Sequence, residues 1–385
     1  MSSRFRQAMA TGEFIVTCEV VARPGKVDQT LDKCVALYGT GLVHAISVAD
    51  NPDGEPALLA DAFAAELAQH GVGTLVQFCS RDRNRRQALS QLYALARAGL
   101  TDIVAMTGDY PANGEDAAFA MGSLELLGLI GELNADLGGD AWEQKGIGRR
   151  VDLMCGAVTS PFKWQPEESA LQYLKLLKKV TAGAQFIITQ MGYDAEKHRE
   201  FADFAQSHLA GVPAIAHVFI LNSNLAQAMN EGHFPGCYAG RKLYADLVEE
   251  ERSADGGRDA RLLRAAKQVA VIKGLGYRGV HLGGVSMDAE GVQSILDAAA
   301  TLATDWRGCA ADLGYAPENG WYLSDQEAAA LAPTDYSADE AYQRVVAGCP
   351  KRLKDGPCGG GMAGSCEVGT GRKCVHVLAY QAALR

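Results

Sequence analysis

Residues 74–106 read TLVQFCSRDRNRRQALSQLYALARAGLTDIVAM. The two ends of this stretch, Thr74–Cys79 and Asp102–Met106, are short apolar runs, and such runs favour strands. Between them, Arg85–Arg97 repeats its apolar residues at helical spacing. Strands that are apolar on both faces are typical of a parallel sheet covered by helices on both sides. The stretch therefore predicts a strand–helix–strand unit of an α/β fold.

The same unit recurs from residue 14 to residue 302. The expected strands are Phe14–Val20, Val43–Val48, Thr74–Cys79, Asp102–Met106, Asp152–Val158, Phe186–Met191, Ala214–Ile220 and Gly279–Leu282. The expected helices are Val27–Leu37, Ala57–Gln69, Arg85–Arg97, Gly122–Asp136, Glu167–Val180, Ala195–His208, Leu225–Met229, Arg258–Lys273 and Ala289–Leu302. Eight such repeats predict a (β/α)8 TIM barrel. An open doubly wound sheet is the alternative, but it expects G-x-G-x-x-G after the first strand, where this chain reads EVVARPG.

The pattern changes after residue 303. We therefore expect a barrel domain over residues 1–303 and a small cysteine-rich, metal-binding domain over residues 304–385. Residues 306–337 show no regular pattern, and short helices are expected over Ala338–Ala347 and Val375–Leu384. Between these two helices lie four of the ten cysteines of the chain.

The four cysteines are Cys349, Cys358, Cys366 and Cys374, with the spacing C-x8-C-x7-C-x7-C and many glycines between them. Clustered thiols in a chain without a secretory signal are more typical of metal ligands than of disulfides. Glycine accepts positive φ, so these loops can turn backbone N–H groups toward an anionic sulfur site. Zinc ribbons usually carry their ligands as close C-x2–4-C pairs. The long gaps therefore favour a 4Fe–4S cluster, with Zn2+ as the alternative.

Composition argues against two classes of partner. The 385-residue chain has a net charge of −10, whereas binding a nucleic-acid backbone requires basic clusters. The longest apolar runs, such as Ala214–Leu221, are too short to span a bilayer. The N-terminal MSSRFR has no apolar core behind it and so does not read as a signal peptide. We therefore expect a cytoplasmic protein with neither nucleic acid nor membrane as partner.

In a TIM barrel the chemistry lies at the carboxyl ends of the strands. Glu19 ends the first strand among apolar neighbours, so desolvation is expected to raise its pKa and make it a general acid. A structural ion pair with Arg23 or Lys26 is the alternative role for this carboxylate. Asp109 follows a Thr-Gly turn after the fourth strand, and Gln190 ends the sixth. Both can hydrogen-bond the polar edge of a heterocycle.

Other notable residues are expected to be structural. His217 and His281 lie inside strands and are expected to be core histidines. The six remaining cysteines are expected to be small buried apolar residues: Cys18, Cys34, Cys79, Cys155, Cys237 and Cys309. The basic run RDRNRR over residues 81–86 is expected either to begin a helix or to serve a small anionic ligand.

Three pieces stand at the strand ends: VTCE over residues 16–19, IVAMTGDYP over 103–111 and LKKVTAGAQFIITQ over 177–190. Together they resemble the methylenetetrahydrofolate reductase family. They occur in the family's order, and the resemblance covers roughly residues 12–300. The tail from Cys349 resembles a separate module, the C-terminal domain of that reductase, which in anaerobes is an accessory metal subunit. In this chain the two are joined.

The resemblance implies a flavin-dependent barrel that reduces 5,10-methylenetetrahydrofolate to 5-methyltetrahydrofolate. It implies FAD, or alternatively FMN, a folate substrate and an oligomeric protein. By position, Glu19 matches the acid that protonates the bridging nitrogen, and Asp109 and Gln190 match substrate-binding residues. The implied flavin contacts are Gln77, Thr107, Gly108, Asp109, Lys175 and Lys179.

The chain departs from the family pattern at Ala49, Gln77 and Gln172, which leaves the flavin type and the nicotinamide site open. The implied electron donor is NAD(P)H, or a ferredoxin-like or other partner redox protein acting through the metal module. Two further functions stay open. One is a folate-dependent methyltransferase with a zinc–thiolate site, and the other is an electron-transfer subunit of a larger reductase complex.

Overall fold

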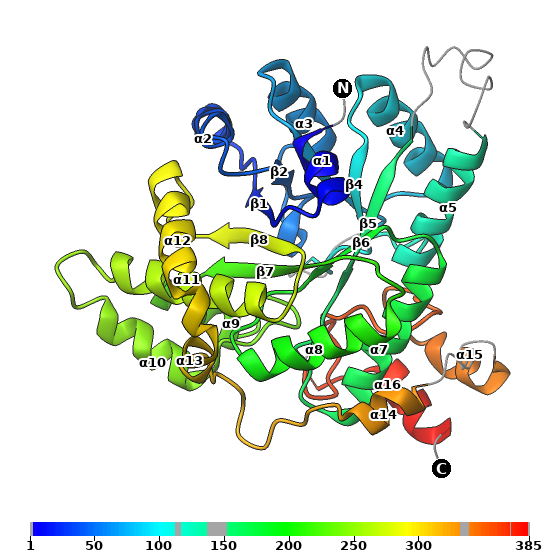
Figure 1. The fold of residues 1–385 in the computed structure, drawn as a ribbon. Coiled ribbons are helices and arrows are strands. Elements are labelled where there is room, and N and C mark those ends of the chain that lie inside the picture. Colours follow the sequence, from blue (N-terminus) through cyan, green and yellow to red (C-terminus); the bar gives the residue numbers. More distant parts are fainter. Residues whose placement is uncertain (1–2, 112–116, 137–151, 332–338, 370, 384–385) are drawn as a thin grey trace.

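The computed structural model describes residues 3–111, 117–136, 152–331, 339–369 and 371–383. Its parallel strands close into a barrel in the order β1 to β8, with helices around the outside (Figure 1). The ring closes where β8 pairs with β1, from Ile15 opposite Gly279 to Cys18 opposite Leu282. The predicted (β/α)8 barrel is therefore confirmed, and the open-sheet alternative is wrong.

Every predicted strand and helix of the barrel is present, with ends shifted by a few residues. The strands are β1 Ile15–Val20, β2 Ala45–Val48, β3 Thr74–Cys79, β4 Asp102–Met106, β5 Met154–Thr159, β6 Phe186–Thr189, β7 Ala214–Ile220 and β8 Gly279–Gly284. The helices are α2 Val27–Gly39, α3 Ala60–Gln69, α4 Arg85–Ala98, α5 Ser123–Asp136, α7 Pro166–Thr181, α8 Ala195–His208, α9 Ser223–Asn230, α10 Gly240–Glu250, α11 Arg258–Gly274 and α12 Ala289–Leu302. Among the described residues of the barrel, α10 and the N-terminal α1 (Arg4–Thr11) were not expected.

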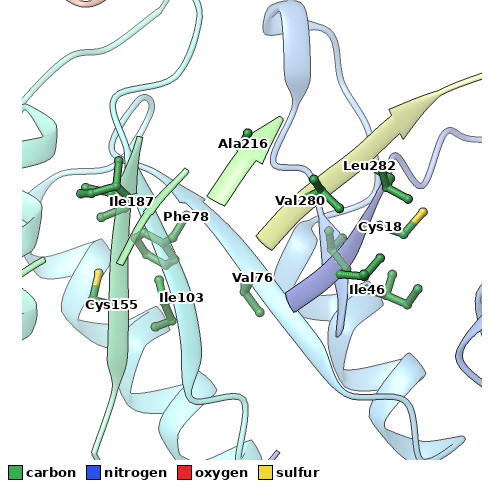
Figure 2. Packing of buried hydrophobic residues seen from close by; sticks show 14 of the residues in the cluster. Cys18, Ile46, Val76, Phe78, Ile103, Cys155, Ile187, Ala216, Val280 and Leu282 are labelled. Atoms are coloured by element: carbon green, nitrogen blue, oxygen red, sulfur yellow. The ribbon is translucent and has the colours of Figure 1, made fainter. Parts of the chain in front are cut away.

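Side chains alternate along each strand between the helix-facing layer and the barrel interior. Figure 2 labels members of the helix-facing core: Cys18, Ile46, Val76, Phe78, Ile103, Cys155, Ile187, Ala216, Val280 and Leu282. A second apolar cluster includes residues of the opposite parity, among them Ile15, Leu75 and Ile215. Two positions further along the same strands stand Thr17, Gln77 and His217. The interior therefore changes from apolar at its amino end to polar at its carboxyl end.

Helix α1 closes the amino end of the barrel. The Phe5 ring lies 5.1 Å from the Phe186 ring, edge to face. Arg6 pairs with the buried Asp102 at 2.5 Å. Because this end is plugged by apolar side chains, the functional groups of the interior gather at the other end.

After α12 the chain returns across the barrel's helices. Helix α13 (Trp306–Ala311) packs on α11, and the Tyr322 hydroxyl donates to Asp194 Oδ2 at 2.8 Å at the start of α8. Residues 306–337 were expected to be irregular, but their described part contains α13 and a second short helix, α14 (Asp325–Ala330). The rest of that segment lies outside the described residues, and the proposed division into residues 1–303 and 304–385 stays a prediction.

Two helices flank the cysteine segment, as expected. They are α15 (Glu340–Val346) and α16 (Val375–Ala383), and α16 packs beside α7 (Figure 1). The predicted end residues Ala338 and Leu384 lie outside the described residues. None of the helices described here is long and apolar enough to cross a membrane.

Candidate active site at the barrel mouth

A cavity of about 440 Å³ opens at the carboxyl ends of the strands. Its walls come from the strand ends, from α7 and from the C-terminal segment that carries Lys351, Cys358 and Glu367. The sequence-predicted residues that line it are Glu19, Gln77, Thr107, Gly108, Asp109, Lys179 and Gln190. Residues from four strand ends (β1, β3, β4 and β6) and one helix are thus brought to a single site.

Glu19 is held by hydrogen bonds inside the barrel. Gln77 Nε2 donates to Glu19 Oε2 at 2.8 Å, and His281 Nε2 lies 3.3 Å from the same oxygen. The other ring nitrogen of His281, Nδ1, is 2.8 Å from the Thr17 hydroxyl. Because a carboxylate only accepts, the His281 proton belongs on Nε2, and Nδ1 accepts from Thr17. The expected alternative, a pair between Glu19 and Arg23 or Lys26, is not formed, and Arg23 lies instead 3.8 Å from Asp53.

The pKa of Glu19 moves in the direction opposite to the one expected from the sequence. Burial does raise it, but the hydrogen bond from His281, the nearby imidazoles and the hydrogen bond from Gln77 outweigh burial and hold the pKa at about 2. The sequence showed the apolar neighbours of Glu19 along the strand but not its partners across the barrel. In the free site, Glu19 is therefore a carboxylate at neutral pH.

His217 and His281 are buried, as expected of core histidines, but they face the cavity instead of the helix layer. Their rings lie 4.7 Å apart, and with Glu19 they form a cluster whose ligand atoms all lie within 4.8 Å of one another. Burial lowers the pKa of His217 to about 3, so its ring is neutral. Strand parity would have revealed this orientation, because His217 stands two residues after the inward-facing Ile215.

Asp109 lies on a sharp turn that only glycine permits. Gly108 has φ +90°, and a Cβ there would lie 3.1 Å from the Cβ of Arg81. Buried Arg81 donates from Nη1 to the Asp109 carbonyl at 2.8 Å, and the Asp53 backbone N–H donates to Asp109 Oδ2 at 3.2 Å. Burial raises the pKa of Asp109, and the ammonium of Lys351 opposes that shift.

The basic run over residues 81–86 supports this rim and begins a helix. Arg83 donates from Nη1 to Asp50 Oδ2 and to the Cys79 carbonyl, both at 2.7 Å. The Asn84 side chain accepts from the Gln87 N–H and caps α4. Of the two roles expected for the run, the helix start is confirmed, and the contacts of Arg81 and Arg83 lie within the protein.

Two lysines expected at the flavin differ in their surroundings. Lys179 lines the cavity and donates to the Val158 carbonyl at 2.5 Å, and burial lowers its pKa to about 7. Lys175 is not among the lining residues. Its ammonium donates to the carbonyls of Gly356 at 3.0 Å and Pro357 at 2.9 Å. The ammonium implied to contact flavin thus supports the C-terminal loop, and its contact with flavin stays a prediction.

The four C-terminal cysteines line a second, smaller cavity of about 30 Å³. Backbone N–H groups point at the sulfurs, and one of them, the Gly360 N–H at Cys358, belongs to the glycine-rich loop that predicted them. The Val368 N–H donates to Cys366 Sγ at 3.4 Å, and burial raises the pKa of Cys374 while N–H groups at the start of α16 oppose it. Cys358 lines both cavities. The other six cysteines are buried, as expected.

A family description, Methylenetetrahydrofolate reductase, matches residues 4–299. The chain belongs to the methylenetetrahydrofolate reductase family. A second description, Methylene-tetrahydrofolate reductase C terminal, matches residues 338–385, so this member of the reductase family carries its C-terminal domain in the same chain. Both halves of the resemblance are thereby confirmed. No curated protein matches the chain.

Solved structures are similar to this reductase-family chain to different degrees. A Clostridium thermocellum protein whose description says that it binds two copies of 5-methyl-5,6,7,8-tetrahydrofolic acid is 14% identical, with a TM-score of 0.54, over 78% of this chain and 98% of that one. Tryptophan synthase from M. tuberculosis is 13% identical, with a TM-score of 0.38, over 80% of this chain and 100% of that one. A 2,3-dimethylmalate lyase is 13% identical, with a TM-score of 0.42, over 79% of this chain and 88% of that one. At 14% identity, the likeness to the C. thermocellum protein concerns the fold alone.

Proposed function

We propose that the chain is a flavin-dependent oxidoreductase that reduces 5,10-methylenetetrahydrofolate to 5-methyltetrahydrofolate. One observation carries this proposal. Glu19, Asp109 and Gln190, which the sequence resemblance matches to functional residues of the family, stand at three separate strand ends, and all three line one cavity. The C. thermocellum protein of similar fold, which binds 5-methyltetrahydrofolate, supports a folate as the substrate.

The lining residues fit a flavin ring beside a pterin. The cavity volume of about 440 Å³ lies in the range of small-molecule sites. Three buried polar atoms of its lining have no hydrogen-bond partner within the described protein: Asp50 Oδ1, Ser160 Oγ and His217 Nε2. Buried polar atoms are normally satisfied, so these three favour a polar ligand. Thr107, Gly108, Gln77 and Lys179 would hold the flavin ring, FAD or FMN, which when bound supplies the hydride.

Glu19 would supply the proton. The displacement of water by the substrate rings desolvates its carboxyl group, which favours the protonated form over the carboxylate of the free site. Glu19 then donates its proton to the bridging nitrogen, and the five-membered ring of the folate opens to an iminium cation. The carboxylate left behind is stabilised by Gln77 and His281, and its negative charge favours the cation that accepts the hydride.

Asp109 and Gln190 would recognise the substrate ring. The carboxylate of Asp109 accepts hydrogen bonds from ring N–H and amino groups. Gln190 Oε1 accepts from the Met191 N–H at 2.9 Å, which leaves Nε2 to donate to a ring acceptor. Their opposite hydrogen-bonding roles would orient the substrate, because a rotated ring would place donors against donors.

The C-terminal cysteines would hold a 4Fe–4S cluster. A single zinc ion, with Zn–S bonds of about 2.3 Å, requires four sulfurs about 3.8 Å apart. No three sulfurs of this described set lie within 4.8 Å of one another, so the thiols suit a larger metal group better. Because Cys358 lines both cavities, it would connect the metal to the flavin site. This shared wall favours electron entry from a ferredoxin-like or other redox partner over NAD(P)H.

The test uses the full chain, purified without oxygen. We expect bound flavin in the absorbance spectrum, iron at the cysteine site, and oxidation of 5-methyltetrahydrofolate with an artificial electron acceptor. A colourless zinc protein that transfers the methyl group to a thiol would replace the reductase by the methyltransferase. A flavin-free chain with neither activity would overturn both enzymatic functions.

A further inference from the structure

The turn that presents Asp109 is held from outside the barrel as well as from inside. Lys351 Nζ donates to the Gly108 carbonyl at 2.8 Å, and the Tyr110 N–H donates to Glu367 Oε1 at 2.7 Å. Peptide groups on both sides of Asp109 are therefore bound by side chains of the C-terminal module, more than 240 residues away in sequence.

The two module residues also bind each other. Lys351 Nζ lies 2.7 Å from Glu367 Oε2, and each side chain is only 3% exposed. A buried ion pair is costly to desolvate unless further hydrogen bonds satisfy its remaining donors and acceptors. Here the backbone of the turn supplies such hydrogen bonds, because the Gly108 carbonyl accepts from Lys351 and the Tyr110 N–H donates to Glu367. The ion pair and the turn therefore stabilise each other. On its other side the Glu367 carboxylate packs against the glycine-rich loop. A Cβ at Gly360 would lie only 2.1 Å from Glu367 Oε2, so this close packing requires a glycine there.

We propose that Lys351 and Glu367 are positioning residues for Asp109. Together with Arg81, which holds the Asp109 carbonyl from the barrel side, they fix three successive residues of the substrate-binding turn. This inference rests on the proposed function for its folate-binding readout. The C-terminal module is then part of the folate site as well as a site for a metal.

The sequence positions of the pair link the two cavities. Lys351 follows Cys349 by two residues, and Glu367 follows Cys366 directly. Any group that binds these thiols also fixes the backbone that carries the pair. Occupancy of the cysteine site and binding of the substrate ring are therefore coupled through the Lys351–Glu367 pair.

The binding test measures the Kd of 5-methyltetrahydrofolate by calorimetry on the full chain. Lys351→Met keeps the apolar length of the side chain but removes its donors. We expect it to raise the Kd about tenfold in the wild-type background and less than twofold in the Asp109→Ala background, because the pair acts through Asp109. Gln381→Ala is the matched control, since Gln381 also joins the module to the barrel, through Glu167, but lies away from the turn.

A second measurement needs no folate. Hydrogen exchange of the Tyr110 amide reports the hydrogen bond to Glu367 directly. We expect Glu367→Ala to speed this exchange at least tenfold, Glu367→Gln, which keeps an acceptor, to speed it less, and Gln381→Ala to leave it unchanged. Metal content and thermal unfolding of each variant show whether it has folded.

The outcomes separate the two proposals. A wild-type chain that does not bind the folate removes the reductase assignment, while the exchange data still decide whether the pair positions the turn. Equal losses of affinity in the wild-type and Asp109→Ala backgrounds, or unchanged Tyr110 exchange in Glu367→Ala, would overturn the positioning role.

Discussion

The two walls of the barrel-mouth cavity are built from different parts of the chain. On one wall, Glu19 is held by Gln77 and His281, all three from strands of the barrel. On the other, the turn that bears Asp109 is held by Lys351 and Glu367 of the C-terminal module. The wall proposed to donate the proton is thus completed by the barrel alone, whereas the wall proposed to recognise the substrate depends on the segment that carries the four cysteines. Substitutions in the C-terminal module should therefore weaken substrate binding more than they affect proton donation by Glu19.

The strongest test of this comparison changes only the wall that carries Glu19. Glu19→Gln keeps the size of the side chain but removes the ionisable proton, so turnover should fall about a hundredfold or more. Flavin content and the Kd for 5-methyltetrahydrofolate should change little, because the Asp109 wall is untouched. Steady-state oxidation of 5-methyltetrahydrofolate and calorimetry would measure both. Turnover within tenfold of the wild type would remove Glu19 as the acid.

The second test changes only the module wall. Cys366→Ser removes a thiol that lines the metal cavity but not the substrate cavity. We expect loss of the metal and, because Glu367 is the next residue, a Kd for 5-methyltetrahydrofolate about tenfold weaker. Cys309→Ser, at a buried cysteine outside the module, is the control. A full metal content in Cys366→Ser would refute the ligand set, and lost metal with an unchanged Kd would show that the walls are independent.

The third test strains the turn that bears Asp109. Gly108→Ala forces an L side chain into φ +90° against Arg81, which should lower the free energy of unfolding by about 1–3 kcal/mol. Gly39→Ala is the control, since Gly39 has no atom within 4 Å of an added Cβ. Urea unfolding would measure both. Equal stability of the two variants would mean that the turn relaxes without cost.

The smallest expected effect is on the pH dependence of stability, and it concerns the wall that carries Glu19. Because the pKa of Glu19 is lowered from 4.5 to about 2 in the fold, its ionised form stabilises the protein above pH 4.5, and this contribution is lost as the pH falls toward 2. His281→Leu removes a main hydrogen bond that lowers this pKa. The loss of unfolding free energy between pH 6 and pH 3 should therefore be about 1 kcal/mol smaller in the variant than in the wild type. An identical pH dependence would show that His281 does not hold the carboxylate.

Sequence reasoning was most successful where the signal is local. Apolar runs and helical spacing placed every strand of the barrel, because the parallel sheet is buried on both faces and its strands are continuous in sequence. Helices α1, α13 and α14 were missed because they are brief and are stabilised by packing on the barrel more than by a periodic pattern of their own. Of the residues that the family resemblance assigned to the site, all but Lys175 line the cavity, because the motifs that carry the resemblance are also local in sequence.

The missed features are contacts between distant residues. The pKa of Glu19 was predicted in the wrong direction because His281, which counters desolvation, is 262 residues away. By its position on α7, Lys175 matched a residue of the family that contacts flavin. In the structure its ammonium binds the carbonyl of Gly356, in the C-terminal loop, which is far from Lys175 in sequence. The two histidines were assigned to the core because burial alone does not reveal which side of a strand faces the interior.

By itself the sequence determined the barrel, the order of its strands and the residue types at their carboxyl ends, since these follow from patterns a few residues long. Only the tertiary structure decided which of those residues meet. Barrel closure brings β8 beside β1 and so gives Glu19 its histidine, and the packing of the module on the barrel gives the Asp109 turn its lysine, 243 residues away. Such pairings depend on how complete elements pack in three dimensions, and no local stretch of the chain records that.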